Sequence, residues 1–405
     1  MSFIDKLLPT KKIAIIDIGT YQVKTAICEQ KDGDFNIVGY GEKRQEINDI
    51  IHGEIGDIEG VCETIESALI KASLDSEINP KDIIINIPTQ SIISEINKIN
   101  YKREDKNSLI NLSELDEIIG KVENISLEKA KKAIQEKTGY QDIDMKLIVS
   151  SITKISIDGQ QVTNPLDFTG ENISISTLNI FIPLSKYNLI QTIGTYLNKN
   201  IVSIVPLEFS IPKLAEYTSL SYEDVIFVDI GNTKTTIIIQ KSGSIVGFNR
   251  IDIGTRDLIK IISEKNSDIT ANIIKKLDDN KNYVEEKKAF FELWKEGFLI
   301  ALSDILGEDT IPYKLFISGG GNNSFMKEYL ENISLASEGI KSIKEKFVII
   351  DNKILNELSY IKNDILKDKT NINLLSQVIC AKEIISMKKD PVREILKKVI
   401  KRIEK

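Results

Sequence analysis

Two acidic turns, each at the end of an apolar run, carry the residue types most suited to chemistry in this sequence. Asp17-Ile18-Gly19 ends the first run and Asp229-Ile230-Gly231 ends the second. An Asp-x-Gly turn at a strand end can present backbone N–H groups to phosphate oxygens, and glycine permits close approach. A pair of carboxylates suits a hydrated Mg²⁺ ion and the water that attacks a γ-phosphate. Either aspartate alone could simply cap a turn, but together they predict a triphosphate site.

The two turns belong to a longer repeat, about two hundred residues apart. Each is followed by a polar turn and a second apolar strand, so that residues 13–25 match residues 225–237. The match continues through Ile37-Val-Gly-Tyr40 and Ile245-Val-Gly-Phe248. Recurrence of strand, turn and hairpin in one order is typical of a duplicated protein with two lobes.

Further residues suit a phosphorylated ligand. Lys24 can neutralise phosphate charge. The run from Leu315 to Ser318 reads as a buried strand that leads into Gly319, Gly320 and Gly321, where a base or ribose could lie directly on the backbone. The sequence has no Walker A motif and no GxGxxG fingerprint, so it does not indicate a P-loop or Rossmann site.

Composition excludes several other classes of site. The 405-residue chain is 41% apolar and 28% charged, and its net charge of −7 disfavours nucleic acid as a partner. Cys28, Cys62 and Cys380 lack metal-ligand spacing, and the lone His52 leaves neither a zinc motif nor a histidine triad. No signal peptide and no run of ~20 apolar residues occurs, so we expect a cytoplasmic protein that does not cross a membrane.

Apolar periodicity predicts an α/β protein with an inserted α+β subdomain. A helix should follow the first hairpin, because apolar residues from Ile58 to Leu69 recur at i, i+3, i+4 and i+7. The insert should hold two polar helices, around residues 115–122 and 127–137, and an extended segment over 145–157. The remaining strands are expected over 12–18, 21–29, 35–41, 83–87 and 175–182, and further helices over 187–197 and 324–330.

The three loops, in this order, resemble the phosphate 1, phosphate 2 and adenosine motifs of the actin, sugar kinase and DnaK-type chaperone superfamily. Within it the chain is most similar to the FtsA family of bacterial cell-division proteins, through the segments 36–41, 53–59 and 157–170. An insert after the first-lobe helix is shared by FtsA and the type IV pilus protein PilM. The resemblance implies an actin-like ATPase fold with two duplicated ribonuclease-H-like lobes around a nucleotide. The first lobe would comprise residues 1–85 and 175–210, the insert 86–174, the second lobe 211–385 and a terminal helix 386–405.

The resemblance also implies ATP and Mg²⁺ as ligands, with Asp17 and Asp229 serving the metal and the attacking water. The residues that would contact phosphates or adenosine are Asp17, Gly19, Thr20, Lys24, Gly231, Asn232, Thr233, Gly319, Gly320 and Gly321. Residues 271–275 resemble an Ala-Glu-x-x-Lys helix on the adenine side, which adds Asn272 and Lys275.

The second phosphate loop departs from the family pattern Asp-Ile-Gly-Gly-Gly-Thr-Thr-Asp. Residues 232–236 are bulkier here and lack the second acid, so we expect ATP binding with at most weak hydrolysis. Lys234 could lie against phosphate or point to solvent.

The tail combines positive charge with an apolar stripe. Between Lys388 and Lys405 there are eight basic and three acidic residues. Pro391 can begin a helix whose stripe is opposite cations that include Lys397, Lys398 and Lys401. The apolar stripe consists of Val392, Ile395, Leu396, Val399 and Ile403. Such a helix either lies in an anionic membrane interface, as the FtsA resemblance implies, or packs on its own domain.

The resemblance implies a filament-forming adaptor that tethers the FtsZ ring to the inner face of the cell membrane at the division septum. The insert would contact other division proteins. A PilM-like scaffold of type IV pilus assembly is the alternative, and it would have no need of the basic tail. A metabolic kinase of the same superfamily would need a base for the acceptor hydroxyl, and the sequence offers no candidate beyond Asp17 and Asp229.

Overall fold

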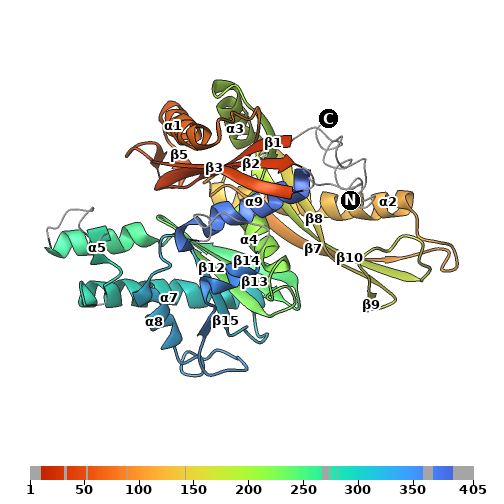
Figure 1. Ribbon diagram of the computed structural model, residues 1–405. Helices are drawn as coiled ribbons and strands as arrows, with labels where there is room; N and C mark the ends of the chain where they lie inside the picture. Colours follow the sequence, from red (N-terminus) through yellow and green to blue (C-terminus); the bar gives the residue numbers. More distant parts are fainter. Residues whose placement is uncertain are drawn as a thin grey trace. The chain divides into compact units, whose positions relative to one another are not determined.

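The computed structural model describes residues 11–31, 34–51, 53–88, 90–141, 143–266, 273–274, 276–279, 281–358 and 368–385. The chain divides into two compact units. Unit 1 contains residues 1–88 and 206–382, and unit 2 contains residues 89–205 and 383–405. Figure 1 shows the elements of both units along the chain.

The first half of unit 1 is a hairpin sheet covered by a long helix. Its strands run in the order β6-β1-β2-β3, with β1 antiparallel to β2 and parallel to β6. The elements are β1 (Lys11–Ile18), β2 (Gln22–Lys31), β3 (Asp34–Arg44), β4 (Ile50–Ile51), β5 (Glu54–Ile55), α1 (Ile58–Ser76) and β6 (Asp82–Asn86). The Asp57 side chain caps α1 by accepting from the backbone N–H groups of Glu59 and Gly60. The continuous apolar run of β1 is explained by burial, since Ile13, Ala14, Ile15 and Ile16 are all buried.

The second half of unit 1 repeats this plan. Its sheet has the order β14-β13-β12-β15-β16, with β12 antiparallel to β13 and parallel to β15. The elements before its last strand are α4 (Leu207–Glu216), β12 (Val225–Ile230), β13 (Thr235–Lys241), β14 (Ser244–Ile251), α5 (Thr255–Asn266), α7 (Val284–Leu306), β15 (Lys314–Ser318) and α8 (Ser324–Glu331). After them come β16 (Val348–Ile349), the 3-10 helices η2 (Asn352–Glu357) and η4 (Lys369–Asn371), and α9 (Ile372–Ile385).

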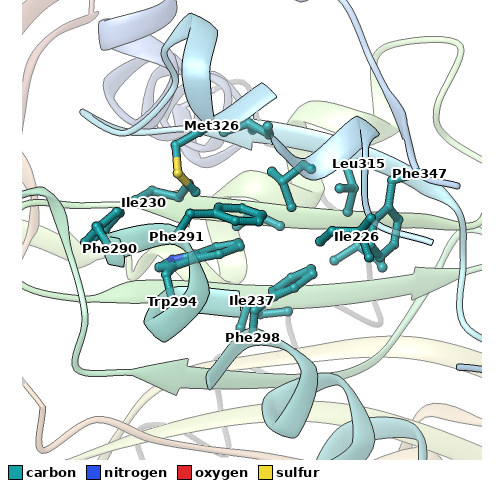
Figure 2. Close-up of a cluster of buried hydrophobic side chains, with 14 of the residues drawn as sticks. Ile226, Ile230, Ile237, Phe290, Phe291, Trp294, Phe298, Leu315, Met326 and Phe347 are labelled. Atoms are coloured by element: carbon teal, nitrogen blue, oxygen red, sulfur yellow. The ribbon is translucent and has the colours of Figure 1, made fainter. Parts of the chain in front are cut away.

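An aromatic row on α7 forms the core of this second half (Figure 2). Trp294 stacks on Phe298 with ring centroids 4.8 Å apart and lies 6.0 Å from Phe291. The Trp294 indole Nε1 donates to Thr235 Oγ1 at 3.0 Å, which satisfies its polar atom inside the core. Thr235 begins β13 directly after the second acidic turn, so the core holds the end of that turn in place.

The predicted repeat is present in three dimensions. In the first hairpin the β2/β3 register slips by one residue after Ile27, opposite Gly39. In the second, the β13/β14 register slips after Ile239, opposite Gly247. The same bulge at the same point of both copies supports a common origin for the two hairpins.

The bulge glycines let a helix lie directly on each hairpin. A Cβ atom on Gly39 would lie 2.1 Å from the Ala72 carbonyl oxygen of α1. A Cβ atom on Gly247 would lie 2.3 Å from Ile305 Cγ2 of α7. Glycine is therefore required by close approach in both copies.

Unit 2 is a sheet with the strand order β7-β10-β8-β9 and a long helix, α2. Its elements are β7 (Ile93–Lys102), α2 (Leu112–Thr138), β8 (Met145–Ile157), β9 (Gln160–Gln161), β10 (Asn172–Pro183), α3 (Leu184–Tyr196) and β11 (Asn200–Ile204). Two apolar clusters join α2 to the sheet, one around Ile118 and Ile175 and the other around Ile134 and Phe181.

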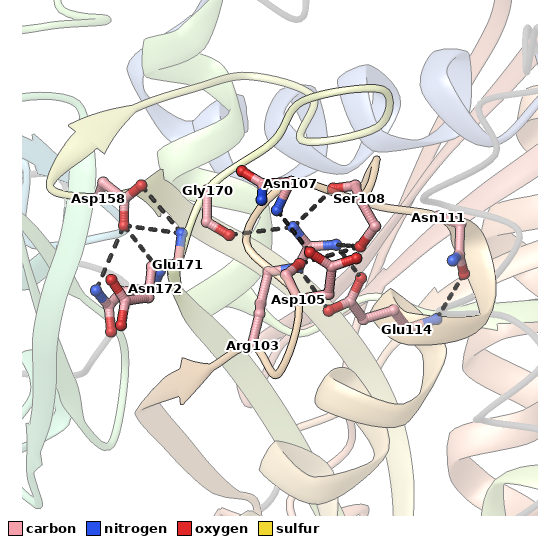
Figure 3. Close-up of polar contacts among 10 residues, drawn as sticks. All are labelled: Arg103, Asp105, Asn107, Ser108, Asn111, Glu114, Asp158, Gly170, Glu171 and Asn172. Carbon is pink, nitrogen blue, oxygen red and sulfur yellow. Dashed lines mark hydrogen bonds and ion pairs between the residues drawn. The ribbon is translucent and has the colours of Figure 1, made fainter.

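A buried guanidinium ties together one end of unit 2 (Figure 3). Arg103 donates through Nε and Nη2 to the two carboxylate oxygens of Glu114, at 2.8 and 3.0 Å. Its Nη1 donates to the carbonyl oxygens of Ser108, at 2.9 Å, and Gly170, at 3.1 Å. The bidentate pair and the two carbonyls join the start of α2 to the loop before it and to the loop that precedes β10.

Most of the predicted elements lie within a few residues of those observed, but the two short helices of the insert are a correction. They form the single helix α2, because Glu123 to Ser126 continues the helix and both of these side chains are buried. The tip of the first hairpin, residues 32–33, and His52 lie outside the described residues. Among the described helices, none combines the length and apolarity that a bilayer crossing requires.

Candidate nucleotide site

The two acidic turns have the same backbone geometry. The Gly19 N–H donates to the Gln22 carbonyl at 3.0 Å, and the Gly231 N–H donates to the Lys234 carbonyl at 2.8 Å. A Cβ atom would lie 2.8 Å from the Gln22 oxygen in the first turn and 3.0 Å from the Lys234 oxygen in the second. Each glycine therefore closes a tight turn that a larger residue would strain.

Closing the turn in this way leaves neighbouring N–H groups available. No described residue accepts a hydrogen bond from the backbone N–H groups of Thr20 and Tyr21 in the first turn. The same holds for Asn232 and Thr233 in the second turn, where the Thr233 hydroxyl is also buried without a hydrogen-bond partner. Successive unpaired N–H donors in a turn form an anion-binding concavity, so both turns suit phosphate oxygens.

Asp17 is held by two amide side chains. Asn86 Nδ2, at the end of the neighbouring strand β6, donates to Asp17 Oδ1 at 2.9 Å. Gln377 Nε2, on α9, donates to the same oxygen at 3.0 Å. These donors fix the orientation of the carboxylate at the end of β1.

Asp229 is held in the corresponding way in the second half. Ser318 Oγ, at the end of the neighbouring strand β15, donates to Asp229 Oδ1 at 2.8 Å. Asn373 Nδ2, on α9, donates to that oxygen at 3.0 Å. Burial raises the pKa of Asp229, the hydrogen bonds from Asn373 and Ser318 oppose the rise, and the nearby Asp17 charge adds to it.

Helix α9 therefore connects the two carboxylates. Asn373 and Gln377 are four residues apart, and side chains at i and i+4 lie on one face of a helix. Each binds the aspartate of a different half of unit 1. The two predicted site aspartates are consequently brought together, as the nucleotide hypothesis requires.

The amides of α9, together with Asn86 and Ser318, were not identified from the sequence. A signal was nevertheless present, because Asn373 and Gln377 are polar residues at helical spacing in an otherwise mostly apolar segment. Asn86 occupies the strand position beside Asp17, and Ser318 the position beside Asp229. Those parallel pairings could be recognised only once the sheets were known.

Two lysines, one buried and one partly buried, lie near the aspartates. Lys24 is 6% exposed and its ammonium donates to the Thr370 carbonyl oxygen. Burial lowers the pKa of Lys24, against the raising effect of Asp17 and Glu42. Burial, with Arg250 nearby, lowers the pKa of Lys234 to about 8, although Glu208 and Asp229 oppose the shift. The Lys234 side chain is partly buried beside the second turn.

The glycine triplet after β15 packs against the second acidic turn. Gly319 has a φ of 82°, and a Cβ atom there would lie 2.8 Å from Asp229 Oδ1. The Gly321 N–H donates to the Ile230 carbonyl at 2.9 Å. Gly320 is exposed, with no atom closer than 3.8 Å to an added Cβ. The triplet thus adjoins Asp229 and leaves open backbone at Gly320, which is compatible with a flat ligand group.

The residues fit a hydrated divalent ion and a polyphosphate. No group of three or more His, Cys, Asp or Glu side chains among the described residues could enclose a metal directly. Two carboxylates with one oxygen each held by protein donors suit an ion that keeps its waters, as Mg²⁺ usually does. Asp17 and Asp229 would hold such an ion, which when bound would neutralise phosphate charge. The N–H groups of the two turns would bind the phosphates.

The other predicted site residues lie outside the described part of the chain. Asn272 and Lys275, on the expected adenine side, are among them. So are the tail residues Val392, Ile395, Leu396, Lys397, Lys398, Val399, Lys401 and Ile403. Their roles remain predictions from the sequence.

Comparison by sequence finds curated relatives that include a cell-division protein. No family model matches the chain. The chain is 23% identical over 255 residues to the cell division protein FtsA of Bacillus subtilis (strain 168). That match covers 61% of this chain and 53% of FtsA, so the chain spans about half the length of this curated relative.

Solved structures give a longer match. A chain of the PilM-PilN type IV pilus biogenesis complex superposes with a TM-score of 0.60 at 9% identity, covering 92% of this chain and 98% of that one. This is an actin-like ATPase fold. The ethanolamine utilization protein EutJ from Carboxydothermus hydrogenoformans covers 91% of the chain with a TM-score of 0.46 at 12% identity. The predicted fold class is confirmed, and with it the resemblance to the actin-like proteins FtsA and PilM.

The actin-like fold accounts for the plan of unit 1. The duplicated hairpins and their paired acidic turns belong to this fold. In this actin-like chain the amides of α9 hold both aspartates, one from each half.

Proposed function

We propose that this chain binds ATP with Mg²⁺ at its two acidic turns and acts as an FtsA-like adaptor. In this role it forms filaments and tethers an FtsZ ring to the inner face of the cytoplasmic membrane at the division septum. The amphipathic tail would supply the membrane contact, and contacts of the insert with other division proteins would supply further partners. Hydrolysis of ATP would be weak or absent.

One observation carries the nucleotide part of the proposal. Asp17 and Asp229 end matching strands of two matching hairpins, and a single helix holds both carboxylates. No described residue accepts from the N–H groups that follow each aspartate, so acceptors for a hydrated cation and donors for phosphate occur together in both turns. The sequence similarity to FtsA favours the cell-division role.

The tethering part rests on the tail sequence. One amphipathic helix binds a membrane weakly and reversibly, whereas a filament presents many helices at once. Attachment would then depend on assembly, and the nucleotide could control assembly by shifting the two halves of unit 1 between conformations.

A PilM-like scaffold of type IV pilus assembly is the second candidate. The structural similarity to PilM in its complex with PilN favours it. In that role the chain would bind a segment of a membrane partner, and the basic tail would be dispensable.

The first experiment measures ATP binding. Fluorescence titration of the full chain with a labelled ATP analogue should give saturable binding that Mg²⁺ tightens. Asp17→Asn and Asp229→Asn should each weaken the Mg²⁺-dependent binding, whereas the exposed Glu331→Gln should bind as the unaltered chain does. Absence of saturable binding by the unaltered chain would overturn the nucleotide proposal.

The second experiment separates the two candidate roles by sedimentation with FtsZ, ATP and anionic liposomes. Removal of residues 391–405 should abolish pelleting with liposomes. A full-length variant with Leu396→Asn and Ile403→Asn keeps every cation of the tail and should also fail to pellet, because apolar burial is lost. Unchanged liposome behaviour in both variants, with no binding of FtsZ, favours the pilus scaffold.

A further inference from the structure

The two aspartates share an arrangement that leaves half of each carboxylate unused. Asp17 Oδ1 accepts from Asn86 and Gln377, and Asp229 Oδ1 accepts from Ser318 and Asn373. No described residue donates a hydrogen bond to Oδ2 of either aspartate. In both halves one oxygen is therefore saturated by protein donors while the other keeps its full capacity to accept.

The amides that hold the carboxylates have acceptors of their own without partners. Asn373 Oδ1 and Gln377 Oε1 are buried and receive no hydrogen bond. Gln377 is completely buried. An unpaired polar atom inside a protein costs free energy, and most such atoms are paired with protein or water. Two of them on one helix face, beside two half-used carboxylates, call for a common explanation.

We infer that Asn373 and Gln377 are outer ligands of the divalent cation, accepting hydrogen bonds from its bound water through their carbonyl oxygens. The inference rests on the proposed nucleotide and metal site and assigns two further residues to it. With Oδ2 of Asp17 and Asp229 they give four oxygen acceptors to which no described residue donates a hydrogen bond. A hydrated cation offers only donors, so it satisfies all four groups at once.

The placement of both amides on α9 gives the cation a second role. Each amide nitrogen holds a carboxylate, and each amide oxygen is free to accept from the ion's water. Bound water of the ion would therefore contact a single helix, α9, which also contacts both halves of unit 1. A partner that orients a metal-binding carboxylate typically changes metal affinity by about 10- to 100-fold when it is removed.

The experiment titrates the full chain with Mn²⁺, read by electron paramagnetic resonance, with and without ATP. Gln377→Met and Asn373→Leu remove both donor and acceptor at similar volume and should weaken Mn²⁺ binding by about 10-fold or more. Gln377→Glu loses the amide donor but keeps oxygen acceptors and adds charge, so it should bind Mn²⁺ at least as tightly as the unaltered chain. Asn373→Asp makes the same test at the other amide if Gln377→Glu does not fold.

The matched control is Ser376→Ala, on the same helix. The Ser376 hydroxyl contacts Ser210 Oγ at 2.9 Å and touches neither aspartate. This variant should retain the Mn²⁺ affinity of the unaltered chain. If Gln377→Met and Asn373→Leu bind Mn²⁺ as tightly as the control, the inference is overturned.

The two proposals fail in different ways. If the unaltered chain binds Mn²⁺ but not ATP, the nucleotide function falls while the metal role of the amides is still measured. If ATP binds with an affinity that Mn²⁺ does not change, and the chain does not alter the Mn²⁺ resonance signal, no ion is bound. The role of Asn373 and Gln377 is then rejected while nucleotide binding stands. If the folded Glu variants bind Mn²⁺ as weakly as the Met and Leu variants, the amides act only as structural donors and the inference is wrong.

Discussion

Asp229 shows at the scale of one residue how a binding site conflicts with stability. Its side chain is buried against Ser318 and Asn373, and burial raises its pKa. A carboxyl with a raised pKa holds its proton more tightly in the folded chain than in the unfolded chain. The protonated carboxyl contributes to the free energy of unfolding at pH values below its pKa in the unfolded chain. That contribution is lost as the pH rises through its pKa in the folded chain.

Unfolding of Asp229→Asn over a series of pH values tests whether ionisation of Asp229 lowers the stability of the folded chain. Asparagine keeps an oxygen that can accept from Ser318 and Asn373 but cannot ionise. Without nucleotide or metal, the variant should have a higher Tm than the unaltered chain at about pH 7, and the difference should shrink toward about pH 4. Thermal unfolding followed by circular dichroism provides the measurement. A constant difference at every pH would show that Asp229 ionisation carries no such cost.

At the scale of elements, each hairpin of unit 1 depends on a helix that lies directly on a glycine. On the first hairpin the obstacle to a side chain at Gly39 is the Ala72 backbone oxygen, at 2.1 Å. On the second hairpin the obstacle at Gly247 is the Cγ2 methyl group of the Ile305 side chain, at 2.3 Å. Backbone cannot move as readily as a side chain, so the two copies should not tolerate substitution equally.

Alanine substitution measures that difference. Gly39→Ala should lower the free energy of unfolding by about 1–3 kcal/mol because α1 must move off β3. Gly247→Ala should lower the free energy of unfolding by a smaller amount. Gly120→Ala is the control, since Gly120 lies inside α2 with nothing within 4 Å of an added Cβ, and should stabilise by about 0.5–1 kcal/mol. Urea denaturation gives all three values, and equal losses at Gly39 and Gly120 would contradict the packing argument.

Arg103 and Lys102 provide a second comparison, between neighbouring residues at the end of β7. The Arg103 side chain is 2% exposed and pairs with Glu114, whereas the Lys102 side chain is 75% exposed and pairs with Glu171. Arg103→Met should destabilise unit 2 by about 3–5 kcal/mol, because Glu114 is left without its buried partner. Lys102→Met should cost about 0–1 kcal/mol. Chemical denaturation measures both, and similar small values would mean that the buried pair is not structural.

At the scale of the whole molecule, a ligand that joins the two halves of unit 1 should stabilise the folded chain. The two turns that would bind phosphate follow strands of two separate sheets, and α9 contacts the aspartate of each turn. Binding only to the folded form adds stability that grows with ligand concentration.

Thermal unfolding with ligand tests this coupling. ATP with Mg²⁺ at 100 times its Kd should add about 2.7 kcal/mol and raise Tm by several degrees. ATP with a chelator should raise Tm less, and the effect of Mg²⁺ should be absent in Asp17→Asn. A Tm that does not respond to ATP and Mg²⁺ at any concentration would contradict binding between the turns.

The sequence by itself determined the parts of this protein that depend on neighbouring residues. The paired Asp-Ile-Gly turns, the hairpins that follow them and the glycine triplet at 319–321 were all predicted, because strand ends and tight turns are specified by a few adjacent residues. The fold class followed from the resemblance of these units, in this order, to the motifs of a known superfamily. The helix α2 was predicted as two helices, whereas the structure continues one helix through Glu123 and Ser126 and buries both side chains.

Only the tertiary structure decided which side chains complete the site. Gln377 binds Asp17 from 360 residues away along the chain, and Asn373 binds Asp229 from 144 residues away. No local pattern specifies such contacts, because they depend on how the strand ends of both halves of unit 1 meet one helix. A carboxylate at a strand end can be predicted from the sequence. The group that orients it depends on packing between distant segments.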